Sequence, residues 1–347
     1  MSRILLNGLA LSVIAAAVLW TAADAQPIIP ADGATEKEAT VRVLSPNVSA
    51  DAQTESRPAS TKNEGTVAAR TLQRDGLPMD WEEVIYEGRP HIKVTTPRAV
   101  YFYDRAGGGL SRIIDGDGHD WIGWHPKPDE YPAGAAGLFR GIPNYQDGPG
   151  HPGYDACESQ VDESSSERIV VGSTCREGSW TYTWTFYPHY AKNHIVSTPE
   201  NVWFLYEGPI AGRYAPRDQY WGNANGRQTV TPNWLEGEQE RGNWQWAYFG
   251  DEQVDRVLFL AMEAPYTEKA VFGYLGAVES EDTPELGLDA SEGMIVFGFG
   301  REDYPDKHIV GDDKTFYLGF IEQKVTDSAS HDEAAQHIQK VLESGAE

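Results

Sequence analysis

The sequence predicts an all-β fold, an antiparallel β-sandwich or jelly roll in a single domain, with one short C-terminal helix. About a dozen short runs of β-branched and aromatic residues alternate with turn residues. From Trp180 to Tyr187, aromatic residues alternate with Thr181, Thr183 and Thr185, and this period of two is typical of a strand with one buried face. We therefore expect a β-sandwich domain over residues 78–325 and an amphipathic helix within 326–347.

The N-terminus has the features of a secretory signal peptide over residues 1–25. Arg3 precedes an apolar stretch, and an Ala-Asp-Ala sequence ending at Ala25 matches the small-residue cleavage pattern. We expect a secreted protein, periplasmic or extracellular; a retained N-terminal anchor helix is the alternative. No later apolar run is long enough to span a bilayer, which predicts no membrane insertion. Residues 26–77 have few large apolar side chains and no sustained period, which predicts a disordered linker.

The chain is strongly acidic, with 28 Lys and Arg against 53 Asp and Glu and a net charge of −25. Such a field repels nucleic acid and anionic membranes, so neither is an expected partner. It also repels an acidic polysaccharide unless basic residues gather locally. The sequence contains no phosphate-binding loop, dinucleotide fingerprint, serine-hydrolase elbow or H-E-x-x-H motif, so we expect no cofactor and no metal. We expect a monomer.

The two cysteines, Cys157 and Cys175, are predicted to form a disulfide. An exported protein folds in an oxidising compartment, where an even pair of cysteines is typical of a structural disulfide. Two cysteines cannot make a four-cysteine zinc site.

The predicted strands follow one another along the chain. They cover residues 92–96, 99–103, 110–114, 121–124, 168–173, 180–187, 194–197, 202–206, 244–249, 257–262, 294–299 and 316–321. Between the third and the fourth lies D-G-D-G-H-D, in which Asp115, Asp117 and Asp120 could indicate calcium binding. The EF-hand spacing would need a Glu where Pro126 stands, so the pattern favours a tight turn.

The C-terminal segment predicts a short helix that covers the sandwich. Ser330 and Glu333 match a capping box. The apolar residues of one helical face are Ala334, Ile338, Val341 and Leu342. His331 and His337 lie on the same helix, and we expect them to be solvated rather than to bind a ligand.

A long aromatic-rich stretch, residues 119–155, is the predicted site. It is too rich in Gly and Pro for a helix, too long for an ordinary loop, and too aromatic for a disordered segment. Rigid aromatic rings suit the flat C–H faces of sugars, so a groove of such rings would bind an oligosaccharide. The rings proposed for it are Trp121, Trp124, Tyr220 and Trp221, with His125, Tyr154, Tyr206 and Glu207 as further substrate-binding residues. The alternative for the Trp residues is burial in the core.

The candidate catalytic residues are Arg140, Asn144, His151, His189 and Tyr190. Removing the proton α to a carboxylate requires a base in reach and a group that neutralises the developing enolate charge. His and Tyr suit the first role, and Arg and Asn suit the second. The alternative is structural: Arg140 would pair with a buried acid such as Asp155, and His189 would end a strand.

Five segments, "GGGLSRIIDGDGHDWIGW", "LFRGIPN", "GHPGYD", "WTFYPHY" and "NVWFLYEGPIAGRY", resemble a group of secreted proteins of environmental bacteria. In that group a Gly-rich strand start, a D-x-x-G-x-D-W turn, an R-G-I-P-N segment and a W-F-L-Y-E-G strand recur in this order. The resemblance covers residues 94–320. The group is associated with polysaccharide utilisation. The resemblance also implies secretion and a single β domain. If the shared segments mark a site, they point to Arg140, Asn144, His151, Tyr206 and Glu207.

The sequence thus favours a polysaccharide lyase that cleaves a uronic-acid-containing polysaccharide by β-elimination. One alternative is a glycoside hydrolase with a carboxylate pair drawn from Glu207, Asp218 and Asp251. The other is a non-catalytic carbohydrate-binding protein. In all three, a polysaccharide or an oligosaccharide is the partner.

Overall fold

The computed structural model describes residues 78–126, 136–145, 148–199, 202–229, 240–264, 270–275, 293–301 and 311–345. All of them belong to the second of two units of the chain, Thr66–Glu347. The predicted signal peptide (residues 1–25) and linker (residues 26–77) lie outside the described residues. Within the described ranges, no helix has the length and apolar character needed to cross a membrane.

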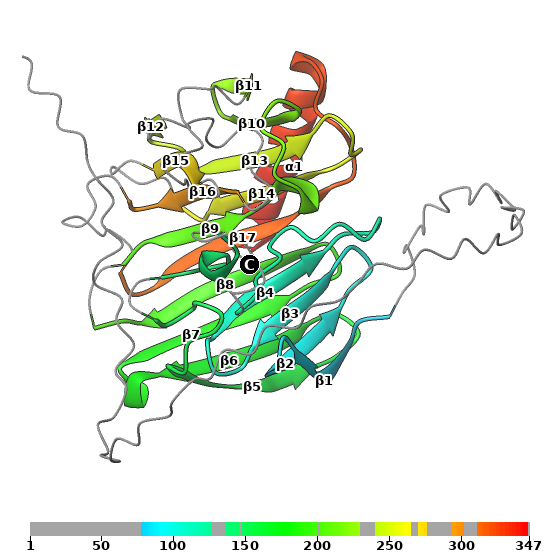
Figure 1. Ribbon diagram of the computed structural model, residues 1–347. Coiled ribbons are helices and arrows are strands. Elements are labelled where there is room, and N and C mark those ends of the chain that lie inside the picture. The colour runs from blue at the N-terminus through cyan, green and yellow to red at the C-terminus, as the bar shows by residue number, and fades with distance from the viewer. Residues whose placement is uncertain are drawn as a thin grey trace, which may run out of the picture. The chain divides into compact units, whose positions relative to one another are not determined.

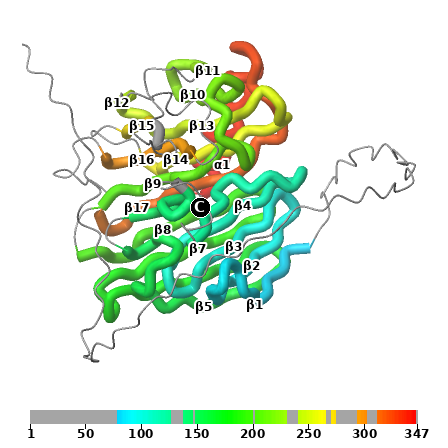
Figure 2. Tube along the Cα trace, in the orientation of Figure 1, coloured from blue at the N-terminus to red at the C-terminus, as the bar shows by residue number. Residues whose placement is uncertain are grey.

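The predicted fold class is confirmed: the described residues form antiparallel sheets and a single C-terminal α-helix (Figures 1 and 2). The strands of the first half are β1 (Asp80–Tyr86), β2 (Arg89–Thr95), β3 (Val100–Asp104), β4 (Gly109–Ile114), β5 (Cys157–Ser164), β6 (Ile169–Cys175), β7 (Trp180–Phe186), β8 (Tyr190–Ser197) and β9 (Phe204–Gly208). The second half contains β10 (Gln219–Asn223), β11 (Gly226–Thr229), β12 (Glu240–Gly242), β13 (Trp246–Asp251), β14 (Val257–Met262), β15 (Ala270–Leu275), β16 (Met294–Phe299), β17 (Lys314–Ile321) and α1 (Ser328–Gly345). The described residues also contain the short 3₁₀ turns η2 (Ala136–Phe139), η3 (Arg176–Gly178) and η4 (Ile210–Gly212).

One layer of the sandwich is a sheet with the strand order β11-β10-β13-β14-β17-β8-β7-β6-β5. The opposite layer consists of two smaller sheets, β1-β2-β3-β4 and β12-β15-β16-β9. Figure 1 shows β1–β4 in front of β5–β8. Residues 140–144, here called the seam segment, join the two smaller sheets. Ile142 pairs with Leu110 of β4, and Gly141 pairs with Glu207 of β9, both antiparallel.

Aromatic side chains fill the space between the layers. Trp180, Tyr182, Trp184 and Phe186 of β7 are buried, while the intervening threonines are only partly buried, so the predicted alternation is confirmed. The ring of Tyr145, just beyond the seam segment, lies 5.1 Å from that of Tyr182. Several β strands in the other half, such as β13 and β14, are buried on both faces and therefore show no alternation.

The far face of the large sheet is covered in part by α1. The predicted apolar face of this helix is confirmed, because Ala334, Ile338, Val341 and Leu342 are all buried. The predicted start is wrong by three residues. The carboxylate of Asp327 accepts a hydrogen bond from the backbone N–H of Ser330, so Asp327 is the N-cap and Ser330 lies within the first turn. The prediction that His331 is solvated is also wrong, since its ring is buried and hydrogen-bonded to the Tyr248 hydroxyl at 2.8 Å.

The D-G-D-G-H-D sequence forms a turn, as favoured. The buried Asp115 carboxylate accepts hydrogen bonds from the backbone N–H groups of Asp117 and His119 and from the indole N–H of Trp121. Residues 121–124 are not a strand, contrary to the prediction. They follow a single bridge between Ile114 and Asp120, and the Asp120 carboxylate accepts hydrogen bonds from the backbone N–H groups of Ile122 and Gly123, which forms a turn instead of a regular ladder.

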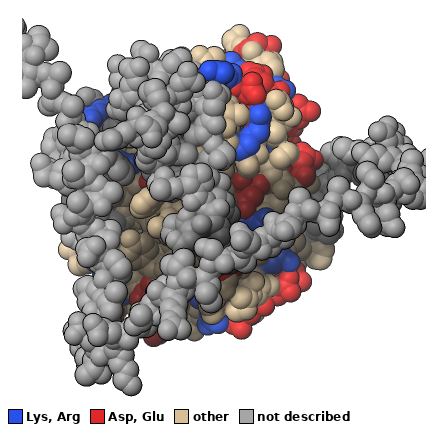
Figure 3. Space-filling view, in the orientation of Figure 1, with Lys and Arg blue, Asp and Glu red and all other residues tan. Residues whose placement is uncertain are grey.

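Surface charge is mixed on the described part of the face in Figure 3, where acidic and basic side chains are interspersed. Ion pairs between surface side chains include those of Lys93 with Glu82 and of Arg168 with Glu163. Such pairs contribute little to stability, typically below about 1 kcal/mol each.

The predicted disulfide is confirmed: Cys157 and Cys175 are bonded and face each other across β5 and β6. Such a bond is compatible with a periplasmic or extracellular protein.

Replacing both cysteines by Ser should lower the free energy of unfolding by about 3 kcal/mol, since a crosslink over a short loop removes that much chain entropy from the unfolded state. Urea denaturation of the double variant checks this. Reductant should destabilise the wild type equally and leave the double variant unchanged. A reductant effect on the double variant would contradict the interpretation.

Candidate functional site

The seam segment holds Asn144 directly over β9. The Ile142–Pro143 peptide bond is cis, and Asn144 has φ 36°, a left-handed conformation that Asn tolerates better than most residues. Two backbone hydrogen bonds fix the segment here: Leu205 N–H donates to the Pro143 carbonyl at 2.6 Å, and Asn144 N–H donates to the Gly150 carbonyl at 3.2 Å. As a result the side-chain amide of Asn144 donates a hydrogen bond to the Glu207 carboxylate.

Glu207 is a buried carboxyl group on β9, the end strand of the sheet β12-β15-β16-β9. Phe204 and Tyr206 of the same strand point into the core, so Glu207 lies on the opposite face of β9. Burial raises the pKa of Glu207 to about 7, against the lowering effects of the Arg301 charge and the Asn144 hydrogen bond. Near neutral pH the group is therefore close to half protonated, and in its protonated form it can donate a hydrogen bond.

The raised pKa of Glu207 predicts a pH-dependent stability. The folded-state value of about 7 exceeds the ordinary value of 4.5, so the unfolded chain loses this proton first as pH rises. The free energy of unfolding therefore falls as the pH rises from about 4.5 to about 7, and above pH 7 it is lower by about 3 kcal/mol than at pH 4.5. Glu207→Gln should increase the free energy of unfolding by up to that amount at pH 8 and change it little at pH 4.5, as measured by urea denaturation.

Glu163→Gln is the matched control. Glu163 is exposed, and its hydrogen bond with Arg168 lowers its pKa, so its loss should not stabilise the protein at pH 8. Parallel stability–pH profiles for Glu207→Gln and the wild type would show that Glu207 titrates normally.

Arg140 stands at the start of the seam segment and is bound by protein carbonyls. Its side chain is buried, and its guanidinium donates to Gly123 at 3.0 Å and to Gly293 at 3.2 Å. It therefore ties the seam segment to the 121–124 loop and to the residue that precedes β16. The alternative pairing with Asp155 does not occur, because Asp155 pairs with Arg89.

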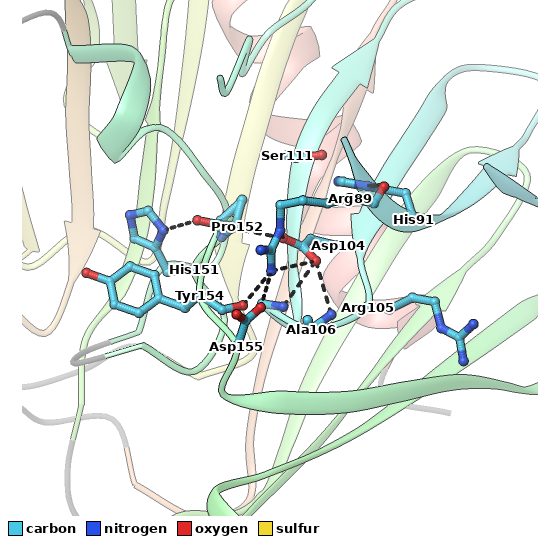
Figure 4. A network of polar contacts seen from close by, with 12 residues as sticks. Arg89, His91, Asp104, Arg105, Ala106, Ser111, His151, Pro152, Tyr154 and Asp155 are labelled. Atoms are coloured by element: carbon cyan, nitrogen blue, oxygen red, sulfur yellow. Dashed lines mark hydrogen bonds and ion pairs between the residues drawn. The ribbon is translucent and has the colours of Figure 1, made fainter. Parts of the chain in front are cut away.

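His151 is buried, and it lies on the same loop as Pro152 and Tyr154 (Figure 4). Burial lowers its pKa to about 4, although interactions with the backbone carbonyls of Pro152 and Phe139 raise it in part. The imidazole is therefore neutral at physiological pH. Its ring lies 4.9 Å from the ring of Tyr154, which is 44% exposed.

A buried carboxylate, Asp104, holds the loop that carries His151 and Tyr154 (Figure 4). It accepts hydrogen bonds from the backbone N–H of Gly153 at 2.8 Å and from the Arg89 guanidinium at 2.8 Å. Arg89 in turn donates to the Tyr154 carbonyl at 2.8 Å and pairs with Asp155. This network fixes the backbone on either side of the Tyr154 ring.

The seam segment and the His151 loop are in contact. Asn144 N–H binds the Gly150 carbonyl, and the α-carbon of Gly141 lies so close to the Pro152 ring that an added Cβ would be 2.6 Å from it. Asn144, which binds Glu207, thus lies on a segment that contacts the backbone of the loop carrying His151 and Tyr154, and these four residues are here called the seam site.

Other predicted residues lie elsewhere. His189 is exposed in the turn between β7 and β8, and Tyr190 stacks on Tyr187 and packs in the cluster beneath α1. Tyr220 belongs to that same cluster, with its hydroxyl bound to the backbone N–H of Val325. These three residues lie on the other layer and do not join the seam site.

The predicted surface groove of aromatic rings is absent from the described residues. Trp121, Trp124 and Trp221 are at most 1% exposed, so no sugar can stack on them. Trp221 stacks on Phe272 at 4.5 Å, and an added Cβ on Gly153 would meet the Trp124 ring at 2.5 Å. Tyr206 is also buried, and its hydroxyl donates to the Trp121 carbonyl. His125 is 7% exposed and packs on Gly137.

Sequence reasoning missed four residues of the region. Phe139 is 41% exposed, and Arg301 acts on the pKa of Glu207. Arg89 and Asp104 hold the His151 loop. Phe139 adjoins Arg140 in the sequence and could have been singled out. Arg89, Asp104 and Arg301 have no local signal, since each acts through a contact with a distant part of the chain.

The carboxylates proposed as a hydrolase pair are not assembled around Glu207. Asp218 and Asp251 both pair with the Arg213 guanidinium, at 3.2 and 2.5 Å. Asp251 is fully buried and also binds the backbone N–H of Gln253. In the described ranges, no three His, Cys, Asp or Glu side chains are arranged to hold a metal ion.

No protein-family model and no curated protein sequence matches the chain. A solved galactose mutarotase-like protein from Lactobacillus casei is 12% identical, with a TM-score of 0.42 over 66% of this chain and 99% of its own. A Paenibacillus xanthan lyase is 12% identical, with a TM-score of 0.40 over 79% of this chain and 27% of its own. The 4-α-glucanotransferase of Thermococcus litoralis is 10% identical, with a TM-score of 0.38 over 73% and 40%. All three TM-scores are below 0.5, so these likenesses assign no activity to the chain.

Proposed function

We propose that the protein is a secreted polysaccharide lyase that cleaves a uronic-acid-containing chain by β-elimination at the seam site. The observation that carries this proposal is the pair formed by Asn144 and Glu207. A buried carboxyl whose pKa is about 7, hydrogen-bonded to an amide, is suited to receive the carboxylate of a uronic acid.

The pair acts on the charge that develops in the reaction. Removing the proton at C5 of the uronate leaves negative charge on its carboxylate oxygens. An amide N–H of Asn144 and the acid proton of Glu207 can donate hydrogen bonds to those oxygens. The positive charge of Arg301, which also acts on Glu207, would stabilise the same negative charge. A protonated Glu207 is required, because an ionised one would repel the substrate.

His151 and Tyr154 are the residues that transfer protons in the proposed reaction. The low pKa of His151 leaves it neutral, and Tyr154 presents an exposed ring beside it. The base takes the C5 proton, the electron pair forms the C4–C5 double bond, the C4–O bond breaks, and the leaving oxygen takes a proton. The exposed rings of Phe139 and Tyr154 offer apolar surface to sugar rings.

Incubation with a panel of uronic-acid polysaccharides tests the proposal. Cleavage should raise ultraviolet absorbance, because the new double bond is conjugated with the carboxylate. The same polysaccharides with their carboxyl groups reduced to alcohols should not be cleaved. Turnover should fall above pH 7, as Glu207 ionises. Equal cleavage of native and reduced chains would contradict carboxylate recognition.

A further inference from the structure

A concave region lies at the β5 end of the large sheet. It is an open hollow of about 700 Å³, lined by residues of four adjacent strands, β5 to β8, and by Pro90, Arg105 and Ala106 of the layer that holds β1–β4. Neighbouring strands lie about 4.8 Å apart, so the hollow extends across three such spacings, or roughly 15 Å. That length suits an extended chain better than a single sugar, and the volume is within the usual range of ligand sites, about 300–1,000 Å³.

Short polar side chains line the hollow. Thr181 and Thr183 project from β7, and Thr174 projects from β6 beside them. Their hydroxyls can both donate and accept hydrogen bonds, which matches the hydroxyl groups of a sugar. The threonine methyl groups and the half-exposed Val196 of β8 add apolar surface between the hydroxyls.

The lining is ordered by its own contacts. The Thr181 hydroxyl is hydrogen-bonded to Ser197 at 2.8 Å, and Gln160 donates to Asp162 at 2.9 Å. Asp162 lies flat across Gly172, where an added Cβ would be 2.1 Å from its carboxylate. Ligand binding would therefore need little reordering of these side chains, which favours affinity.

The charge of the lining excludes a polyanion. Two carboxylates, those of Glu158 and Asp162, face the hollow with one cationic residue, Arg105. The Arg105 guanidinium already pairs with Glu83 at 2.8 Å and donates to the Ser159 carbonyl. An acidic polysaccharide would meet net negative charge here, whereas a neutral chain would not.

We propose that this hollow binds a neutral polysaccharide chain through the threonine hydroxyls of β6 and β7, at a site separate from the seam site. The inference does not depend on the proposed lyase activity. A secreted protein with two such sites would hold a neutral polymer while acting on an acidic one.

Calorimetric titration of the full chain with soluble starch, galactomannan, arabinoxylan and hydroxyethylcellulose tests the inference. At least one of these neutral polymers should bind saturably. The double variant Thr181→Val with Thr183→Val keeps side-chain shape and strand preference but removes two hydroxyls. Its Kd should rise by about ten- to thirty-fold, as expected for two lost hydrogen bonds.

Thr185→Val is the matched control, since Thr185 lies on the same strand and face but outside the hollow. It should leave the Kd unchanged. Binding of none of the four polymers would overturn the proposal, as would an equal loss in Thr185→Val. A loss of neutral-polymer binding in Glu207→Gln would also overturn it, because the polymer would then occupy the seam site. Failure of the lyase assay alone would leave this binding result intact.

Discussion

Replacing Asn144 by Gly should lower the kcat of uronan cleavage by about 10²–10³-fold, the usual cost of losing one donor to a developing oxyanion. Gly is the chosen replacement because it adopts φ 36° without strain, so only the amide is lost. The KM should change much less than kcat, since the charge that Asn144 stabilises grows mainly in the transition state. Steady-state kinetics by ultraviolet absorbance measure both constants.

Asn225→Gly is the control for this variant. Asn225 is an exposed turn residue between β10 and β11, and its backbone N–H binds the Asn223 side chain. It should retain wild-type kcat. A rise in KM with unchanged kcat in Asn144→Gly would show that Asn144 binds the ground state only.

Replacing Arg140 by Met should destabilise the protein by about 3 kcal/mol or more. The variant leaves the buried carbonyl of Gly293 and the partly buried carbonyl of Gly123 without the donors that Arg140 provides, and the loss of a buried hydrogen bond costs about 1–3 kcal/mol. Urea denaturation at pH 7 measures the change. Because the seam segment joins β4 to β9 next to Arg140, the variant should also lose activity through a displaced Asn144.

Arg168→Met provides the comparison, since Arg168 is exposed and pairs with Glu163. Its free energy of unfolding should stay close to that of the wild type, because an exposed ion pair is screened by solvent. A wild-type stability for Arg140→Met together with a large loss of kcat would contradict the structural role. It would support the sequence-based hypothesis that Arg140 acts on the substrate directly.

The sequence predicted two kinds of strand well: β7, which has one partly exposed face, and β14 and β16, which are buried throughout and were predicted with their observed bounds. In β7 the alternation of aromatic residues with threonine directly reports which face is buried. Strand β10, which is buried throughout, contains Gly and Asn and was not predicted. β5 is an edge strand with mostly exposed polar residues, and its sequence resembles a loop. Local periodicity therefore predicted the fold class, but not every strand.

The seam site depends on contacts that local sequence does not encode. Asn144 and Glu207 are 63 residues apart and meet because the seam segment pairs with β9. The sequence identified both as site residues, but not that they are hydrogen-bonded. It placed Trp124 at the surface because Gly and Pro surround it, whereas the His151 loop folds back and brings Gly153 against its ring. The helix start was misplaced because Ser330 also fits a cap, although Asp327 holds that position.

Mass analysis of the products formed in heavy-oxygen water tests the central claim, β-elimination at the seam site, most directly. Elimination adds no water across the broken bond, so each new non-reducing end should be unsaturated and no product should carry the heavy oxygen from cleavage. Asn144→Gly should give the same products more slowly. Saturated ends, with one heavy oxygen incorporated per bond cleaved, would show hydrolysis and contradict the proposed mechanism.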